Sequence, residues 1–584
     1  MGEERLIREI KGYALKNAVD HGGKAVPGPV ISKLLGSHPE LRSKAKEVAL
    51  LVRKIVDEVN SLPRDEQEKL LEEEFPHLLQ QKRKEERKGL PPLPNAEKLG
   101  EVKTRFAPNP DFFIHLGNAR PAILSYEYAK MYEGTMVLRF EDTDPKTKPP
   151  LPEAYRKIKE DLKWLGVKWD EEYIQSLRMN IYYDVAKKVI EAGGAYVDLC
   201  SQTEFRKYKL SGKPCPHREQ GIDENLELFD KMISGHFGEG EAVLRIKTDL
   251  TLSDPSVIDW VAFRIIDTDK HPHPIVGSKY VAWPTYNFAA GVDDHLMGIT
   301  HILRGKEHSI NTVKQSYLYS HLGWSYPEVI NLGRLHLEGL VLSKSLIKKL
   351  LKENPNKFEG PEDVRFGTIA SLRNRGIEAE MIRQLILEVG VKPSDAKISW
   401  DNIAAANRKL IDPKTPRLMA VMRPVTLTVK GYEGPKSVVI PKHPTNSALG
   451  SRSIDIHVVD GEARFLVEMR DVEMGIKRGG LRLMELCNVE VERVSGGLVE
   501  ARYVGNDLQL ARDKGYPIVQ WVPEGGGVRL RVSVPEGLEL RVEEGYGEKH
   551  LRELQPGSKV QLVRYGFVVL REVGSVVEAT FMHR

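Results

Sequence analysis

The spacing of apolar residues predicts helices at the start of the chain and an α/β region after them. Val48, Leu51 and Ile55 follow the three- and four-residue spacing of a helix. From about residue 100 to 345, short apolar runs alternate with helical patterns. This alternation predicts a parallel, Rossmann-like sheet with helices on both faces.

The pattern changes three more times along the chain. Residues 198–275 interrupt the alternation with proline, glycine and charge, and the segment after residue 350 returns to helical spacing. Beyond Pro413, short alternating strands separated by glycines predict antiparallel barrels. We therefore expect a multidomain α/β protein with these parts: a helical domain and linker over 1–95, a Rossmann-like domain over 96–197 and 276–345, an insertion over 198–275, a helical subdomain over 346–410, and two β-barrels over 411–584.

A strand that runs into a tight turn and then a helix predicts a phosphate site. An apolar strand precedes the turn, His115 ends it, and a helix begins near Gly117. The start of a helix presents unpaired backbone N–H groups and a partial positive charge, which suit an anion. Gly117 would let a ligand approach the backbone, and His115 adds a side-chain donor at the same place.

A second short segment, 341–345, offers a cation between two hydroxyl groups. Lys344 is flanked by Ser343 and Ser345. A lysine in such a loop could reach the distal phosphates of a nucleotide that is seated at the first segment. Each segment alone is weak evidence, and the two together are considerably stronger.

Composition limits the class of protein without identifying it. Hydrophobic residues make up 41% of the chain and charged residues 29%, as in ordinary globular proteins, and the net charge is only +4. No apolar run is long enough for a membrane span, and the N-terminus lacks the apolar core of a signal peptide. Three cysteines in 584 residues argue against a disulfide framework. We expect a cytoplasmic protein with no membrane partner.

Four residues in the insertion have the spacing of a metal site. Asp198 and Cys200 form one pair, and Cys215 and His217 form a second pair about fifteen residues later. Two Cys-x-Cys or Cys-x-His pairs at this separation would make a zinc knuckle. Asp198 stands where the first cysteine would be, and carboxylates are less common in structural zinc sites. Bound zinc and simple packing of the two thiols both remain open.

The segments around His115 and Lys344 resemble the HIGH and KMSKS signatures of class I aminoacyl-tRNA synthetases. Further blocks in the same order resemble the glutamyl and glutaminyl subgroup; they are 139–145, 283–286, 292–298 and 302–308. The region from about 400 onward is similar to the anticodon-binding β-barrels of the archaeal and eukaryotic members. The chain therefore resembles archaeal-type glutamyl-tRNA synthetases.

The resemblance implies an activity and its reactants. The members of this subgroup join glutamate to tRNA(Glu) through a glutamyl-adenylate, with ATP as a reactant and Mg²⁺ supporting its phosphates. In this subgroup the insertion handles the acceptor end of the tRNA, and activation requires bound tRNA. Whether tRNA(Gln) is also charged stays open.

The resemblance also implies roles for individual residues. Catalysis would involve His115, Asn118 and Lys344, and ATP would bind at His115, Gly117, Asn118, Ser343, Lys344 and Ser345. Glutamate would bind at Arg105, Asn109, Glu141, Tyr286 and Arg304. Guanidinium groups grip carboxylates in a bidentate fork, so Arg105 and Arg304 suit the two carboxylates of glutamate. Glutamyl enzymes carry arginine at the position of Arg304, whereas glutaminyl enzymes carry a small uncharged residue.

The chain departs from the family pattern close to this site. Asn118 replaces the last histidine of the first signature, and Phe112, Phe113 and Ile114 replace a glycine-containing approach. Asparagine can still bond a ribose or a phosphate, so the change is compatible with catalysis.

Two alternatives follow from these departures and from the subgroup itself. The chain could be a glutaminyl-tRNA synthetase, which Arg304 argues against, or a catalytically silent tRNA-binding paralogue.

The charged stretch over 65–88 fits a solvated helix face; its alternative is a contact to tRNA or to another synthetase. Partners of the N-terminal domain, which could include translation factors, stay open. Arg452, Tyr516 and Trp521 are candidate anticodon contacts, although barrel cores need such residues too.

Overall fold

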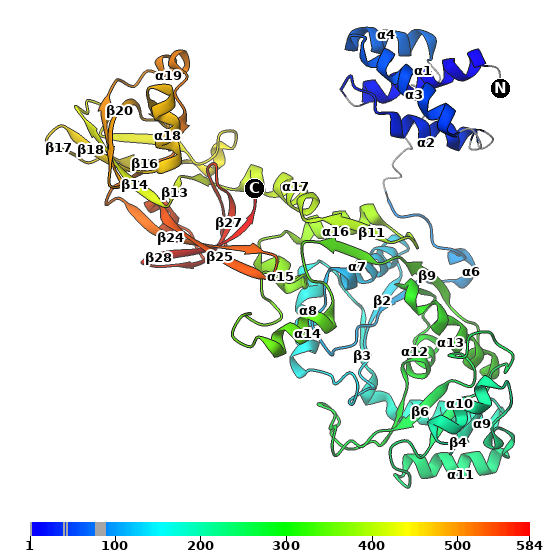
Figure 1. Cartoon of the computed structure of the whole chain (residues 1–584). Helices are drawn as coiled ribbons and strands as arrows, with labels where there is room; N and C mark the ends of the chain where they lie inside the picture. Colours follow the sequence, from blue (N-terminus) through cyan, green and yellow to red (C-terminus); the bar gives the residue numbers. More distant parts are fainter. Residues whose placement is uncertain (1–2, 21, 39–40, 42–44, 76–88) are drawn as a thin grey trace. The chain divides into compact units, whose positions relative to one another are not determined.

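The computed structural model describes residues 3–20, 22–38, 41, 45–75 and 89–584, and the chain divides into two compact units, Met1–Pro91 and Pro92–Arg584 (Figure 1). The first unit is helical, and its helices are α1 (Glu3–Asp20), α2 (Pro27–Ser37), α3 (Ala45–Asn60) and α4 (Arg64–Glu74). Their apolar faces share a core that includes Leu15, Val52 and Leu71. Part of the charged stretch forms α4, and residues 76–88 lie outside the described residues.

The second unit is built on a five-stranded parallel sheet with the strand order β3-β2-β1-β8-β9. The strands are β1 (Lys103–Phe106), β2 (Thr135–Phe140), β3 (Glu171–Ile174), β8 (His301–Gly305) and β9 (Glu328–Leu332). Its helices are α6 (Ala96–Leu99), α7 (Leu116–Met131), α8 (Pro152–Trp164), α9 (Met179–Glu191), α12 (Tyr286–Leu296) and α13 (Ser309–Leu322). The predicted parallel sheet is confirmed. Its central strands are almost wholly buried because helices cover them.

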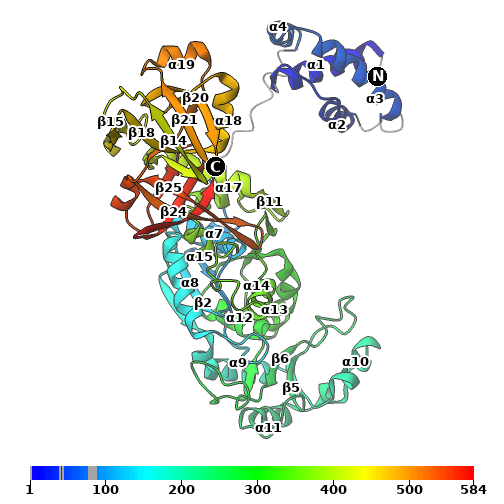
Figure 2. The ribbon, with the colours of Figure 1, turned by 60° about the vertical axis from the view of Figure 1, so that its left-hand side comes forward.

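A separate four-stranded antiparallel sheet interrupts this domain. Its strands are β4 (Ala195–Asp198), β5 (Val243–Ile246), β6 (Val261–Ile265) and β7 (Ala282–Pro284). Helices α10 (Gln202–Leu210) and α11 (Ile222–Ile233) accompany it (Figure 2). The sheet therefore extends a few residues beyond both ends of the expected 198–275 insertion, because β4 and β7 bring the chain in and out of it.

Helices return after the parallel sheet. They are α14 (Lys344–Glu353), α15 (Ile369–Asn374), α16 (Ala379–Val389) and α17 (Trp400–Ile411), and a short parallel pair joins β10 (Leu335–Glu338) to β11 (Ala396–Ser399). Thr368 is the N-cap of α15 and Ser399 is the N-cap of α17. Each side-chain hydroxyl accepts a backbone N–H of the first turn of its helix. The helical pattern predicted from the sequence is thus interrupted by one paired strand.

The C-terminal region forms two curled sheets. The first contains β14 (Pro424–Lys430), β17 (Val458–Val459), β18 (Glu462–Glu468), β19 (Leu481–Leu483), β20 (Cys487–Ser495), β21 (Leu498–Tyr503), β22 (Ile518–Val519) and β23 (Val522–Pro523). Helices α18 (Met469–Arg478) and α19 (Leu508–Lys514) pack beside it (Figure 2). A hairpin, β15 (Ser437–Pro441) with β16 (Ser451–Asp455), adds its apolar side chains to the same core.

The second curled sheet has the order β12-β26-β27-β28-β24-β25-β13. Its strands are β12 (Arg417–Leu418), β13 (Ala420–Met422), β24 (Gly527–Glu536), β25 (Glu539–Glu548), β26 (Lys559–Leu562), β27 (Gly566–Val573) and β28 (Val576–His583).

In both sheets one extended segment pairs with the two opposite edges. Residues 417–422 form β12 at one edge and β13 at the other, and residues 518–523 do the same through β22 and β23. Pairing at both edges curls each sheet and leaves few unpaired backbone groups. The predicted C-terminal antiparallel barrels are confirmed as curled sheets, which also contain the parallel pairs β14–β21, β24–β28, β12–β26 and β19–β22.

Candidate active site

A cleft of about 1040 Å³ lies at the carboxyl ends of the central parallel strands. Parallel sheets bind ligands at this edge, where consecutive strands part toward different helices. The cleft contains all but one of the residues expected to bind ATP and glutamate; they are Arg105, Asn109, His115, Gly117, Asn118, Glu141, Tyr286, Arg304, Ser343 and Lys344. Ser345 is not among the residues that line it, and its hydroxyl lies 3.0 Å from that of Ser343.

The start of helix α7 is fixed by a reciprocal pair of hydrogen bonds. The Gly117 N–H donates to Nδ1 of His115 (3.0 Å), and the His115 N–H donates to Oδ1 of Asn118 (3.2 Å). This capping box satisfies two backbone donors that a helix end leaves unpaired. Asn118 therefore holds His115 in place through its oxygen, while its amide nitrogen keeps two donors for a ligand.

The structure gives a steric reason for glycine at position 117. A Cβ atom at this position would lie 2.8 Å from Cε1 and 2.9 Å from Nδ1 of His115. The imidazole occupies the space that a side chain would need, so glycine is required for the ring to turn back onto the helix.

His115 is a neutral hydrogen-bond donor toward the cleft. Burial, together with the nearby Lys344 ammonium, lowers the pKa of His115 to about 4. Because Nδ1 accepts a backbone N–H, the single ring proton of the neutral form resides on Nε2.

Arg304 is a buried cation without a carboxylate partner among the described residues. Its guanidinium donates to neutral oxygens of Gln315 (3.2 Å), Thr312 (2.7 Å) and Tyr326 (3.2 Å). In the described part of the chain the Nε atom of Arg304 has no hydrogen-bond partner, and the residue is 5% exposed. An unneutralised buried charge is costly, so this position favours an anionic ligand.

Arg105 and Glu141, by contrast, belong to a compensated network of charges. Arg139, behind the cleft, donates to Glu141 (3.0 Å) and to Asp294 (2.8 Å), and Arg105 donates to Asp294 (3.2 Å). Burial raises the pKa of Glu141 despite these arginines. Burial also raises the pKa of Tyr286 to about 12, so this side chain keeps its proton and can donate it in a hydrogen bond.

Asp293 and Asp294, in the segment 292–298, are not among the residues that line the cleft. Both are buried within helix α12. Asp293 accepts hydrogen bonds from Gln175 (3.1 Å), Arg178 (2.9 Å) and Tyr182 (2.7 Å). Their function in the structure is to hold arginines and helices together under the cleft.

Lys344 is the first residue of helix α14, and Ser343 is its N-cap, which accepts the Leu346 N–H (3.4 Å). The Lys344 Nζ donates to Asp111 Oδ1 (3.1 Å), and Lys348 Nζ donates to Asp111 Oδ2 (2.9 Å). Asp111 received no role from the sequence. It precedes the aromatic departure from the family pattern, and the structure places it beneath two cations of α14.

The aromatic departure has a packing explanation. Phe112 and Phe113 are buried in a cluster with Ile347, Phe358 and Phe366. They fill the space between the turn that carries His115 and the helix that carries Lys344.

His308 was also given no role by sequence reasoning. It lines the cleft, and burial beside Arg304 lowers its pKa to about 4. Its ring lies 5.5 Å from that of Tyr286, and its Nδ1 is 3.0 Å from Nδ2 of Asn311. The sequence pointed to His308 only because this residue ends the segment 302–308, which resembles the glutamyl and glutaminyl subgroup.

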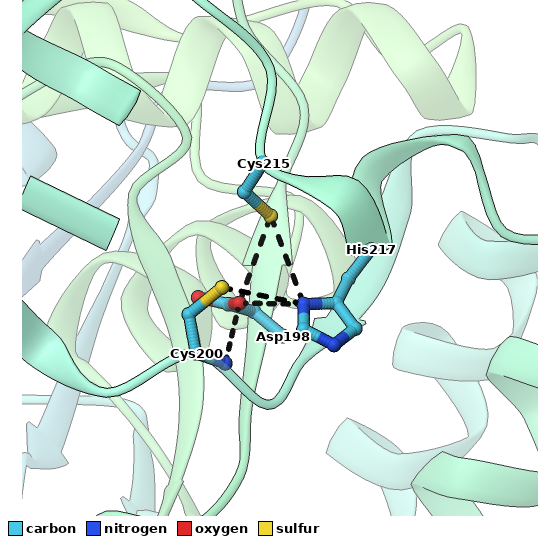
Figure 3. Close-up of side chains that lie close together, drawn as sticks. All are labelled: Asp198, Cys200, Cys215 and His217. Carbon is cyan, nitrogen blue, oxygen red and sulfur yellow. Dashed lines mark hydrogen bonds and ion pairs between the residues drawn. The ribbon is translucent and has the colours of Figure 1, made fainter. Parts of the chain in front are cut away.

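The four candidate metal ligands of the insertion do converge (Figure 3). Their ligand atoms all lie within 4.8 Å of one another, with separations that include Cys200 Sγ–His217 Nδ1 (3.4 Å) and Cys215 Sγ–Asp198 Oδ1 (3.6 Å). Ligands at tetrahedral zinc distances lie about 3.3–3.8 Å from one another, so the arrangement fits that ion.

The same cluster is also held together by hydrogen bonds. Asp198 Oδ1 accepts the Cys200 N–H (3.0 Å), and Asp198 Oδ2 accepts Arg245 Nε (2.6 Å). Burial and Asp198 raise the pKa of the Cys200 thiol to about 12, so its proton would have to be displaced by the ion. Zinc at this site stays a prediction.

The comparisons with known proteins match this architecture. Residues 101–413 match the family model of the class I tRNA synthetases (E and Q), catalytic domain, and residues 415–504 match the anti-codon binding domain of the same family. The chain belongs to the class I tRNA synthetases of the E and Q type.

Named relatives from this synthetase family agree over nearly the whole chain. A Glutamate--tRNA ligase of Hyperthermus butylicus is 55% identical and covers 94% of this chain and 96% of its own length. A Glutamate--tRNA ligase of Aeropyrum pernix is 53% identical over the whole of both chains. A solved glutamate tRNA ligase from Elizabethkingia meningosepticum is 24% identical, with a TM-score of 0.39, and covers 53% of this chain and 70% of that one.

Among the described helices of this synthetase, none has the length and apolar character needed to cross a membrane. The cytoplasmic location remains a prediction.

Proposed function

We propose that this chain joins L-glutamate to tRNA(Glu) in two steps. The glutamate α-carboxylate attacks the α-phosphorus of ATP, which gives glutamyl-adenylate and pyrophosphate. A hydroxyl of the terminal tRNA ribose then attacks the activated carbonyl and releases AMP. The names of relatives that are 48–55% identical support this reaction.

We infer glutamate as the amino-acid substrate from the surroundings of Arg304. A buried guanidinium that contacts only neutral groups favours a ligand carboxylate, and a side-chain carboxylate is what separates glutamate from glutamine. Arg105 would hold the other carboxylate, Glu141 the ammonium group, and Tyr286 and Asn109 would complete the pocket. The Oδ1 atom of Asn109 already accepts the Asp111 N–H (3.0 Å), so its amide N–H group is the part left for the substrate.

The ATP phosphates would lie at the start of α7. The Nε2 proton of His115, the amide of Asn118 and the backbone at Gly117 supply neutral donors there. Lys344 would stabilise the negative charge that develops on pyrophosphate as its bond to the α-phosphorus breaks. Ser343 and Ser345 would lie beside it at the start of α14.

Mg²⁺ would support the nucleotide phosphates. Of the cleft carboxylates, Glu141 accepts a hydrogen bond from Arg139, Asp144 pairs with Arg264 (2.7 Å), and Glu307 pairs with Arg334 (3.9 Å). Because these carboxylates are already neutralised, phosphate oxygens and water would supply most of the ligands of the ion, as Mg²⁺ prefers.

The tRNA would contact the region of residues 415–504, which matches an anti-codon binding domain. The insertion would take the acceptor end. Charging of tRNA(Gln), and binding of other synthetases or translation factors by the N-terminal unit, stay open.

The test is a charging assay with purified tRNA(Glu) and tRNA(Gln), each with glutamate and with glutamine. Glutamate on tRNA(Glu) is the expected product. Glutamine on tRNA(Gln) would identify a glutaminyl enzyme, and tight tRNA binding without any charging would identify a silent paralogue. Glutamate on both tRNAs would support the proposal and add the second substrate.

A further inference from the structure

Helix α14 presents two lysines to a single carboxylate. Lys344 and Lys348 are four residues apart, which places them on the same face of the helix. Each ammonium bonds a different oxygen of Asp111, at 3.1 and 2.9 Å. The Asp111 side chain is 13% exposed, so this carboxylate needs a cation beside it.

The two lysines differ in where else they can reach. Lys344 lines the cleft, whereas Lys348 does not and lies over the ring of Phe112 (5.7 Å). Burial lowers the pKa of Lys344, and its ammonium is therefore poorly solvated where it stands. Asp111 pairs with it in this state, and pyrophosphate would offer a second anionic partner.

An apolar contact joins the turn that carries Asp111 to helix α14. Phe112 and Phe113 pack with Ile347 on the inner face of α14. With this apolar contact kept, rotation of the Lys344 side chain alone can exchange one anion for another.

We propose that Asp111 and Lys348 form a counter-ion relay for Lys344. Asp111 holds Lys344 while the phosphate site is empty, and Lys348 neutralises Asp111 when Lys344 transfers to the leaving pyrophosphate. Lys348 is thus a positioning residue, which acts through Asp111 and touches no substrate. The relay rests on the proposed function, since it needs Lys344 at the pyrophosphate.

The relay makes a specific kinetic prediction for Lys348→Met. Without Lys348, the transfer of Lys344 would leave a half-buried carboxylate unpaired, so kcat should fall about tenfold. The KM for ATP should change little, because the ground state still has Lys344 on Asp111. Adding Asp111→Asn should raise kcat again, to the value of Asp111→Asn alone, since an amide needs no counter-ion.

The assay is glutamate-dependent ATP–pyrophosphate exchange with tRNA(Glu) present, run on the full chain. The control is Lys349→Met, because Lys349 is the next residue of α14, lies 66% exposed and pairs only with Glu353 (3.8 Å) among the ion pairs of the described residues. The kcat of Lys349→Met should match that of the parent. Thermal unfolding of each variant tests whether the fold is kept.

The relay would be refuted by a parental kcat in Lys348→Met, or by a double variant no faster than Lys348→Met. A structural defect in α14 would give additive losses with no rescue. An inactive parent would instead refute the proposed function, which separates the two outcomes.

Discussion

At the scale of single residues, the cleft is selective because a few charges lack partners while most are compensated. Arg105 and Arg139 share the carboxylates of Asp294 and Glu141, whereas Arg304 has only neutral partners. A ligand carboxylate would supply the anionic partner that the Arg304 guanidinium lacks among the described residues.

Arg304→Ala should therefore weaken the use of glutamate and leave ATP binding unchanged. Truncating one partner of a desolvated charge pair costs about 2–5 kcal/mol, mainly because the other charge is left unpaired. The measurement is kcat/KM for glutamate beside the KM for ATP. Glutamate kinetics like those of the parent would show that another residue holds the side-chain carboxylate.

His115 should stay neutral through the whole physiological range. Its pKa of about 4 reflects burial first and the Lys344 ammonium second, so protonation should begin only well below pH 6. NMR of histidine-labelled protein, assigned with His115→Gln, should show the Nε2–H form at pH 6. Lys344→Ala should raise the pKa of His115, because it removes a nearby positive charge; an unchanged pKa would place Lys344 elsewhere in solution.

At the scale of elements, the start of helix α7 depends on the absence of one Cβ atom. Gly117→Ala should push the His115 ring out of position, and a displacement of about 1 Å at a reacting site can cost on the order of 10²-fold in rate. The measurement is kcat/KM for ATP, with the far-ultraviolet circular dichroism of the variant as a check on folding.

The chain offers a matched control for this change. Gly28 is also the second residue of a helix, α2, and a Cβ atom there meets nothing within 4 Å. Gly28→Ala should leave activity as it is. Equal effects of the two substitutions would mean that Gly117 matters for helix formation and not for His115.

The cluster of Asp198, Cys200, Cys215 and His217 gives a second test at this scale. Elemental analysis of protein purified without chelator or added metal should find near-stoichiometric zinc. A Cys200→Ser, Cys215→Ser double variant should lose it. Cys487→Ser is the control, because Cys487 is buried in β20, outside the cluster. Zinc-free parent protein would leave the four residues as a hydrogen-bonded cluster.

At the scale of the whole molecule, the chemistry belongs to one of the two compact units. Every residue that lines the cleft lies between 105 and 344, whereas residues 1–91 have a core of their own. A chain that begins at Pro92 should therefore keep the parental kcat and the KM values for ATP and glutamate. The KM for tRNA reports whether the first unit adds contacts. A large loss of kcat would show that the cleft depends on residues 1–91.

The sequence by itself determined much of the architecture and most of the cleft. The alternation of short apolar runs with helical patterns predicted the parallel sheet, and the short alternating strands beyond Pro413 predicted the C-terminal barrels, because periodicity reflects which face of an element is buried. Residues such as His115 and Lys344 could be predicted because their chemistry depends on short, local segments. The spacing of Cys200 and Cys215 predicted a cluster for the same reason.

Only the tertiary structure decided which polar residues face a ligand and which face one another. Arg452 and Trp521 had suited anticodon contacts, but Arg452 is buried in an ion pair with Glu548 (2.7 Å) and Trp521 lies in a barrel core. Asp111 contacts residues 233 and 237 positions away, and no local pattern encodes such a pair. Burial and pairing are properties of the packed chain, and they decide whether a charge is compensated or remains available for a substrate.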